Sequence, residues 1–216
     1  MLIHPWDAAQ SDDEWKRWLA PRDFGTLIAS GRDRSVPVVV PTHFVYDGDA
    51  TVLLHLARPN PVWRAVEENP HVVLSVIDDV AFIPSEWKEV DADEPGHGIP
   101  TSYYAAVALT CTTEVLTGEA LLDVLRVQLA HFEPGSSVAD PSVHTRKLPG
   151  IRGLRLTVDA VAAKFKYGGN ADDVHRAKVA DRLAERAARG DEAARDHLLR
   201  RTPLPSSPHP SPRSTS

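Results

Sequence analysis

The sequence predicts a mainly β fold of the α+β kind, an antiparallel sheet closed into a small barrel with peripheral helices. Short β-rich stretches follow one another along the chain, with hairpin-turn signals such as Asp47–Gly48–Asp49 between them. A parallel Rossmann sheet would need strands that alternate with helices throughout, and a G-x-G-x-x-G motif after the first strand; the sequence has neither. With 216 residues, 42% of them hydrophobic, the chain can bury one good core.

The strands are predicted from β-branched and apolar runs that end at glycine, proline or aspartate. Pro41 lies inside the second run and implies an edge, a bulge or a bend there. Asp78 and Asp79 separate two shorter runs. The predicted strands are 24–30, 36–46, 50–57, 71–77, 80–84, 102–116 and one or two strands over 153–167.

The helices are predicted from apolar spacing of three and four residues. The first starts at Ser11, with Glu14 in the position that a capping box requires, and ends at Pro21. The others are 61–69, 119–132 and 172–201, the last broken near Gly190. Residues 85–100 and 133–149 are predicted loops.

Three segments follow from this pattern: a barrel domain over 1–170, a helical segment packed on it over 171–201, and a disordered tail over 202–216. Five prolines and five serines in the last fifteen residues predict the disorder.

Composition limits the classes of function. The net charge of −6 disfavours nucleic acid as a partner. No apolar run approaches the roughly 18 residues of a membrane span. The single cysteine excludes an intrachain disulfide, and the first residues lack the pattern of a signal peptide. We therefore expect a soluble cytoplasmic protein without a membrane partner, which acts on a small-molecule substrate.

The stretch LLHLARPNPVW (53–63) is the first candidate site. A strand ends near His55, and Arg58 and Asn60 precede a helix whose free N–H groups suit a phosphate. Thr42 and His43 lie on the preceding strand of the hairpin, close to His55. The alternative is a capped helix whose arginines lie in solvent.

Other motifs carry weaker signals. FIPSEW (82–87) and GIPTSYY (98–104) place hydroxyls and aromatics around a loop, and KFKYGGN (164–170) alternates lysines with aromatics. Cys111 has the features of a buried structural thiol. No histidine pair has zinc-site spacing, whereas an axial haem ligand needs no motif; His43, His55 and His131 are candidates for that role.

Several segments together resemble a known family: VVVPTHFVYDGD, LLHLARPNPVWRAVEENP, AFIPSEW, PTSYYAAV, LPGIRGLRL and KFKYGGN. In order and spacing they are similar to the FMN-binding negative transcriptional regulator (PaiB-like) family, over roughly residues 1–200. The resemblance implies a homodimer of antiparallel split β-barrels of the FMN-binding type, with FMN at the dimer interface.

The resemblance also implies residue roles. The phosphate end of FMN would lie at the turn after the third strand, the ring or ribityl chain against the preceding strand, and further segments would close the site from the partner chain. A late-strand lysine completes the pattern, although the serine–glutamine–asparagine run that commonly follows it is replaced by FKYGGN. The residues so assigned are Leu56, Ala57, Arg58, Asn60, Trp63 and Arg64 for the phosphate, Thr42 and His43 for the ring side, Ser85, Trp87, Thr101 and Tyr103 for the partner side, and Lys164.

Three functions are compatible with this family. The first is an FMN-dependent redox protein, whose general acid and base the sequence does not identify. The second is a haem b-dependent piperazate synthase, which closes the N–N bond of N5-hydroxy-L-ornithine and would use His55 or His43 as axial ligand. The third is a DNA-binding negative regulator; no clearly basic recognition helix favours it.

Overall fold

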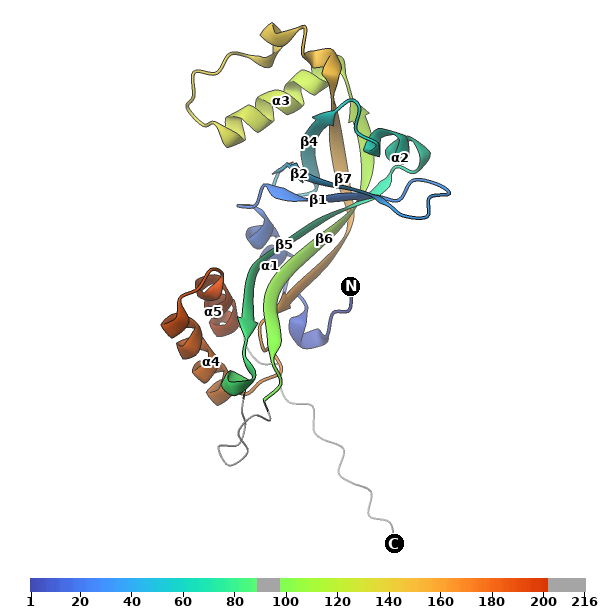
Figure 1. Ribbon diagram of the computed structural model, residues 1–216. Coiled ribbons are helices and arrows are strands. Elements are labelled where there is room, and N and C mark those ends of the chain that lie inside the picture. The colour runs from blue at the N-terminus through green and yellow to red at the C-terminus, as the bar shows by residue number, and fades with distance from the viewer. Residues whose placement is uncertain (89–97, 202–216) are drawn as a thin grey trace. The chain divides into compact units, whose positions relative to one another are not determined.

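The computed structural model describes residues 1–88 and 98–201 (Figure 1). Within them the strands are β1 Phe24–Ala29, β2 Val38–His43, β3 Val45–Tyr46, β4 Thr51–Ala57, β5 His71–Ile83, β6 Thr101–Leu116 and β7 Ile151–Lys166. The α-helices are α1 Asp12–Leu19, α2 Val62–Glu68, α3 Gly118–Phe132, α4 Asp173–Arg186 and α5 Asp191–Arg200. Four short 3₁₀ turns are η1 Pro5–Asp7, η2 Ser85–Lys88, η3 Pro141–His144 and η4 Leu148–Gly150.

The strands form one sheet in the order β2-β1-β5-β6-β7-β4-β3. The pairs β1–β2, β1–β5, β3–β4 and β4–β7 are antiparallel. The two outermost strands of this order, β2 and β3, are separated in the sequence by Phe44 alone, so the sheet must curve round until its edges meet. Phe44 is fully buried at this corner. The predicted antiparallel barrel is confirmed, and Pro41 lies in edge strand β2, as its missing N–H requires.

The chain divides into two compact units. The first contains residues 9–77 and 106–163, and the second contains 2–8, 78–105 and the chain from Lys164 onward. Strands β5, β6 and β7 each contribute residues to both. Each unit is described separately below.

Three predictions of local structure were wrong. Residues 36–46 were predicted as one strand, whereas β2 ends at His43 and β3 begins at Val45, with Phe44 between them. Residues 71–84 were predicted as two strands, whereas β5 is continuous over His71–Ile83. Asp79 adopts a positive φ of 55°, a conformation that aspartate tolerates, so the strand continues past it. The capping box at α1 also does not form: the Glu14 carboxylate accepts from the backbone N–H of Gln10 at 2.6 Å, and the Ser11 side chain makes no capping bond.

Strand β4 shows how the first unit divides its side chains between two faces. Val52, Leu54 and Leu56 are buried in the core, while the alternate residues, including Leu53 and His55, are half-buried on the face that α3 contacts. Helix α3 brings Leu121, Val124 and Gln128 into the interior. His55 therefore lies on the face of the sheet that a helix covers.

In the second unit, α4 and α5 form a hairpin (Figure 1). Both carboxylate oxygens of the buried Asp191 accept from the Arg186 guanidinium, at 2.6 and 2.8 Å, and this ion pair lowers the pKa of Asp191. Gly190 joins the helices at a φ of 87°, and a side chain there would collide with the carbonyl oxygen of Val80. His197 Nε2 lies 3.0 Å from Asp79 Oδ2, which ties α5 to β5.

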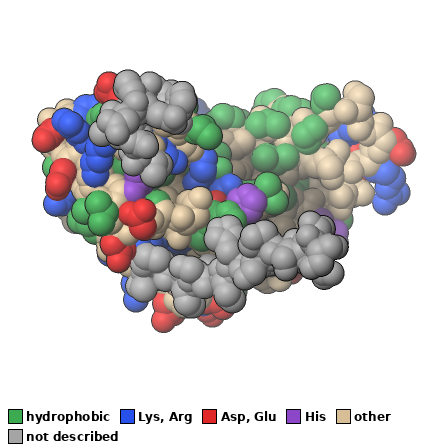
Figure 2. All heavy atoms as spheres, turned by 90° about the horizontal axis from the view of Figure 1, so that it is seen from below, with side chains coloured by type: hydrophobic (Ala, Val, Ile, Leu, Met, Phe, Trp, Pro, Cys, Tyr) green, Lys and Arg blue, Asp and Glu red, His purple; other side chains and the backbone are tan. Residues whose placement is uncertain are grey.

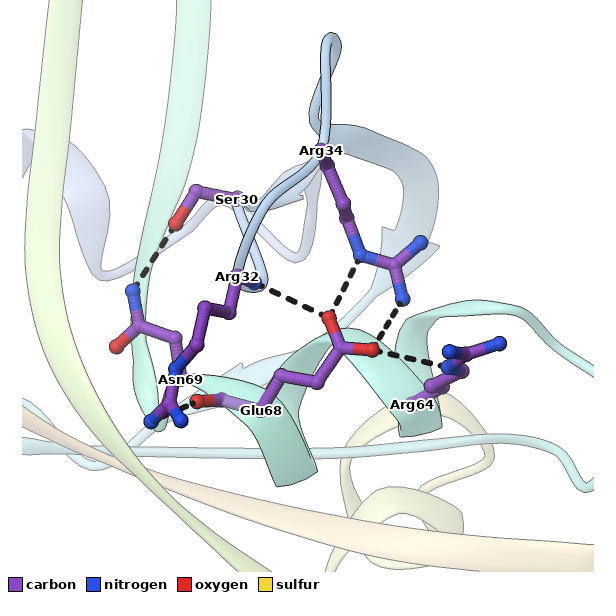
Figure 3. Close-up of polar contacts among 6 residues, drawn as sticks. All are labelled: Ser30, Arg32, Arg34, Arg64, Glu68 and Asn69. Atoms are coloured by element: carbon purple, nitrogen blue, oxygen red, sulfur yellow. Dashed lines mark hydrogen bonds and ion pairs between the residues drawn. The ribbon is translucent and has the colours of Figure 1, made fainter.

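Helix α2 is anchored by a polar network in the first unit (Figure 3). The Glu68 carboxylate accepts from the backbone N–H of Arg32 at 3.1 Å, and from the side chains of Arg34 and Arg64 at 2.9 to 3.1 Å. Asn69 donates to the Ser30 hydroxyl at 3.0 Å. The loop after β1 is thereby attached to the C-terminal end of α2. The Arg32 N–H and the Arg34 guanidinium lower the pKa of Glu68 to about 2.

Of the helical predictions, 61–69 and 119–132 are confirmed by α2 and α3, and 172–201 by α4 and α5 with the break at Gly190. The predicted disordered tail, 202–216, and much of the predicted loop 85–100 lie outside the described residues. The segment boundaries 1–170 and 171–201 remain predictions.

Glu68→Gln should lower the melting temperature at neutral pH, because the neutral amide loses the charge-assisted bonds to both arginines. The folded-state pKa of Glu68 lies below its ordinary value of 4.5, so the ionised carboxylate stabilises the folded state at pH values above 4.5. This stabilisation is lost as the pH falls toward 2. The difference in melting temperature between wild type and variant should therefore shrink over this pH range. Thermal unfolding followed by circular dichroism checks it, and a difference independent of pH would contradict it.

Candidate functional site

The first unit contains a cavity of about 650 Å³ that we call the histidine cavity. Its volume is within the usual range of small-molecule and cofactor sites. Most of its wall is apolar and comes from α3 and the segment after it, and three histidines interrupt this wall. The lining residues are His43, His55, Leu125, Gln128, Leu129, Phe132, Glu133, Val138, Ala139, Pro141, His144, Lys147, Leu148 and Ile151.

The β3–β4 hairpin brings His43 and His55 to this cavity together. Val45 pairs with Leu53. Two residues further along each chain in the same register are His43 and His55. The structure therefore brings together the two histidines that the sequence placed on neighbouring strands.

A buried glutamine holds the imidazole of His55. His55 Nδ1 lies 2.5 Å from Gln128 Oε1, and Gln128 is only 5% exposed. Because an amide oxygen can only accept, the proton of the neutral ring must sit on Nδ1. Nε2 then carries a lone pair and has no hydrogen-bond partner among the described residues, so it can accept a hydrogen bond, take a proton or ligate a metal.

Gly153 makes this contact possible. It is the partner of His55 in the β4–β7 ladder. A Cβ at this position would come within 3.2 Å of Leu116 Cβ and 3.4 Å of Val124 Cγ2. The missing side chain lets α3 lie close to the sheet, and one turn after Val124 the helix presents Gln128 to His55.

His43 has aromatic and acidic neighbours. Its ring packs edge-on against Phe24 and Phe132, with centroids 4.8 and 5.0 Å away, and Nδ1 is 4.0 Å from Asp23 Oδ1. The third candidate histidine, His131, contacts Asp23 at 3.5 Å and does not line the cavity. The carboxylate of Asp23 thus lies beside both rings.

A second concavity of about 430 Å³ adjoins the first, and we call it the arginine hollow. Arg58 and Arg152 line it, and it shares Leu148 and Ile151 with the histidine cavity. Arg58 is held by its backbone N–H to Gly150 O at 2.8 Å and by its guanidinium to Pro149 O at 3.3 Å. Arg152 bonds Glu67 at 3.2 Å and lies 5.5 Å from the Trp63 ring. Two guanidinium groups beside one opening suit a phosphate or carboxylate.

Other predicted residues hold the turn that follows β4. Asn60 Oδ1 accepts from the N–H of Val62 at 3.0 Å, and Trp63 Nε1 donates to Ala57 O at 2.8 Å. Leu56 is buried in the core, while Arg64 points outward to Glu68. Thr42 donates to the carbonyl of His43 at 3.0 Å. Their predicted roles toward FMN remain predictions; in this structure these groups hold the turn and its flanks.

The remaining predicted residues belong to the second unit. Trp87 is buried with the Arg186 guanidinium 4.5 Å from its ring, and Tyr103 is buried against Tyr167. Lys164 donates to Leu2 O at 2.9 Å and lies 3.8 Å from Asp7, whose pKa burial raises. Two further residues predicted to contact FMN also lie in this unit. Ser85 is at the start of η2, and the Thr101 hydroxyl oxygen accepts a hydrogen bond from Lys166 Nζ at 2.7 Å.

Sequence reasoning missed Gln128 and Arg152. Gln128 carried a signal: it interrupts the apolar stripe of α3, at the spacing of Leu121, Val124 and Leu125. Arg152 carried no signal in the sequence, because its place beside Arg58 follows from the pairing of β4 with β7. Cys111, predicted to be structural, is fully buried, and burial raises its pKa to about 12.

Comparison with known proteins identifies the family. The model of the family described as "Putative FMN-binding domain" matches residues 1–160. The chain belongs to this FMN-binding family. The resemblance found in the sequence is thereby confirmed. A curated relative, "Protease synthase and sporulation protein PAI 2" of Bacillus subtilis (strain 168), is 22% identical over 190 residues, covering 85% of this chain and 89% of that protein.

Two solved structures share the split-barrel fold of this FMN-binding family. The "FAD and Heme binding protein" from Mycobacterium smegmatis has a TM-score of 0.59 at 19% identity, covering 75% of this chain and 74% of that one. The flavocytochrome Anf3 from Azotobacter vinelandii has a TM-score of 0.56 at 18% identity, with coverage of 80% and 75%. At these identities the likeness establishes the fold.

Two further features of the described residues concern other classes of site. None of the helices in residues 1–88 and 98–201 is long and apolar enough to cross a membrane. The same residues contain no group of three or more His, Cys, Asp or Glu side chains arranged to hold a metal ion.

Gln128→Leu should release the His55 ring from its single tautomer, because leucine offers no acceptor to Nδ1–H. The ¹⁵N chemical shifts of the His55 ring, measured at alkaline pH, report which nitrogen carries the proton. In the wild type Nδ1 should be protonated, and in the variant the proton should be shared between the two nitrogens. Unchanged ring shifts in the variant would contradict the assignment, and Gln10→Leu, on the exposed N-terminal segment, is the control.

Gly153→Val should lower the free energy of unfolding by about 1–3 kcal/mol, because the added methyl groups overlap Leu116 and Val124. Gly150→Ala is the matched control, since a Cβ there meets nothing within 4 Å. Urea unfolding measures both variants. Equal stability of the two variants would show that α3 does not depend on the gap at Gly153.

Proposed function

We propose that this protein binds FMN in the first unit, with the flavin ring in the histidine cavity and the phosphate at the arginine hollow. The observation that carries the proposal is the continuity of the two concavities through Leu148 and Ile151. An apolar cavity with a few polar groups suits a planar ring system, and a pair of guanidinium groups beside it suits a phosphate.

The residues present fit the cofactor by their chemistry. Arg58 and Arg152 would hold the phosphate, and Leu125, Leu129 and Phe132 would exclude water from the ring. The polar groups of the wall would bond the heteroatoms of the ring; His55, Gln128 and Lys147 are among them. When bound, FMN supplies hydride or electron transfer, while the protein supplies position and electrostatics.

A homodimer is part of the proposal. It is supported by the family resemblance, in which the segments of Ser85, Trp87, Thr101 and Tyr103 close the site from a partner chain. We also place the protein in the cytoplasm, which is consistent with the single buried, free Cys111. Light scattering coupled to gel filtration would test the dimer by its mass.

Haem is the second candidate, and the His55–Gln128 bond favours it. A haem-ligating histidine is neutral and commonly donates its other N–H to an acceptor, which orients the ring and raises its basicity. His55 has this arrangement. The solved relatives named as flavin and haem proteins support either cofactor in this fold. The corresponding activity of a haem b enzyme is closure of the N–N bond of N5-hydroxy-L-ornithine, in which the N–O bond breaks and water leaves.

Duplex DNA is not part of the proposal. The net charge is −6. Figure 2 shows Asp and Glu side chains beside Lys and Arg side chains on the face that it draws.

FMN titration followed by flavin fluorescence tests the main proposal. Wild-type protein should retain FMN through gel filtration, and Arg58→Gln/Arg152→Gln should bind at least about tenfold more weakly, since a hydrogen bond to a charged group contributes about 1.5–3 kcal/mol. Arg155→Gln is the control, because Arg155 lies on the same strand, pairs with Glu114 and lines neither concavity.

Haemin added to the same protein separates the two candidates. Retention of haemin with a sharp Soret band, lost in His55→Ala, together with failure to retain FMN, would replace the main proposal by the second. His43→Ala distinguishes the two possible axial ligands. Retention of neither cofactor would refute both.

A further inference from the structure

The second unit contains a concavity of about 530 Å³ that the FMN proposal does not use. It lies between η2 and the start of α4, and we call it the lysine hollow. Lys88 and Lys178 line it, together with Asn170, Asp172 and His175. The KFKYGGN motif ends here, since Asn170 is its last residue.

The wall of the lysine hollow differs in chemistry from that of the histidine cavity. Among the described residues of its wall, the imidazole of His175 is the only ring, and Ala171 and Val174 are the only apolar members. A flavin or porphyrin would find neither an apolar wall nor an aromatic partner here. The hollow suits a small polar ligand.

No ion pair with a described residue neutralises the charges of the two lysines. Lys88 is half-buried, and no ion pair forms at Lys88 or Lys178 within residues 1–88 and 98–201. Burial and the nearby Lys166 lower the pKa of Lys88. An anion between the lysines would relieve this unfavourable environment, because an opposite charge favours the ammonium form.

A histidine adds an unused polar atom. Among the described residues, Nε2 of His175 is buried without a hydrogen-bond partner. Buried polar atoms in proteins are nearly always bonded, so such an atom indicates a missing water or ion. Burial and Lys88 lower the pKa of His175, and an anion would oppose both effects.

The acidic group of the wall is already engaged. Asp172 caps α4, its Oδ1 accepting from the backbone N–H of His175 at 2.8 Å. Its single negative charge faces the charges of Lys88 and Lys178, with Lys166 and His175 nearby. Among the described residues of the wall, two lysines stand against this one carboxylate.

We propose that the lysine hollow is a binding site for a small phosphate-bearing anion, held by Lys88, Lys178 and His175. A tetrahedral oxyanion offers enough acceptor atoms to bond two ammonium groups and an imidazole N–H at once. The site is built from residues other than those proposed for the phosphate of FMN, so the two sites can be tested independently.

Titration with inorganic phosphate, followed by ¹H–¹⁵N spectra of the full chain, tests this proposal. Saturable shifts are expected at Lys88, Asn170 and His175 and in the His175 ring. Lys88→Gln/Lys178→Gln should weaken the binding at least tenfold. Lys16→Gln, which removes a lysine of the first unit paired with Asp49, should leave the binding unchanged. Acetate at the same ionic strength separates phosphate recognition from general screening of charge.

Three outcomes would overturn the inference: shifts that do not saturate, shifts that persist in the double lysine variant, and equal shifts with acetate. A fourth would reassign the hollow: if Lys88→Gln/Lys178→Gln weakened FMN binding as Arg58→Gln/Arg152→Gln does, the hollow would be part of the flavin site. Phosphate binding that survives in the arginine variant, with FMN binding lost, would confirm that the sites are separate. Failure of the FMN proposal alone would leave the phosphate result intact.

Discussion

The antiparallel ladder between β4 and β7 is the interaction on which the candidate site depends. It sets His55 opposite Gly153 and Ala57 opposite Ile151. At the first pair, the absent side chain of Gly153 lets α3 approach until Gln128 bonds the imidazole. Beyond the second pair, the turn after β4 meets the segment before β7 and places Arg58 beside Arg152. A slip of one residue in this ladder would turn His55 to the core face and separate the two arginines.

The proposed site combines two electrostatic environments on one surface. The histidine cavity is lined mostly by apolar side chains, with the His55 ring held by the Gln128 amide. The two guanidinium groups lie at the adjoining hollow, where Arg58 is exposed to water and its desolvation cost is small. A cofactor with an apolar ring and a charged end matches this division. The same reasoning sets the lysine hollow apart, because it has cations and a polar wall without an apolar chamber.

Membership of the FMN-binding family and the split-barrel fold agree with this arrangement, and neither distinguishes flavin from haem. The distinction lies in which group of the site carries the binding energy. Under the proposal, FMN would depend on the guanidinium groups that meet its phosphate, whereas haem would depend on an imidazole that ligates iron. His55, held by Gln128, would supply that imidazole, and Arg58 with Arg152 would supply the phosphate contact. Flavin and haemin binding by matched variants should therefore depend on separate residues, in the arginine hollow and in the histidine cavity respectively.

The sequence by itself determined the helices, the break at Gly190, the hairpin that brings His43 to His55 and most of the strands, because these follow from local patterns of apolar residues, glycine and proline. It also pointed to Arg58, since a charged turn between a strand and a helix is visible in the order of residues. Tertiary structure alone decided the rest of the site. Gln128 is 73 residues from His55 in the chain, and Lys88 and Lys178 are also far apart in the sequence, although they line one hollow. Such contacts depend on strand register and helix packing, which no local pattern encodes. Asp79 shows that a local pattern can also mislead. The residue signals a turn in the sequence, but it stays within a strand because the ladder of β5 continues on both sides of it.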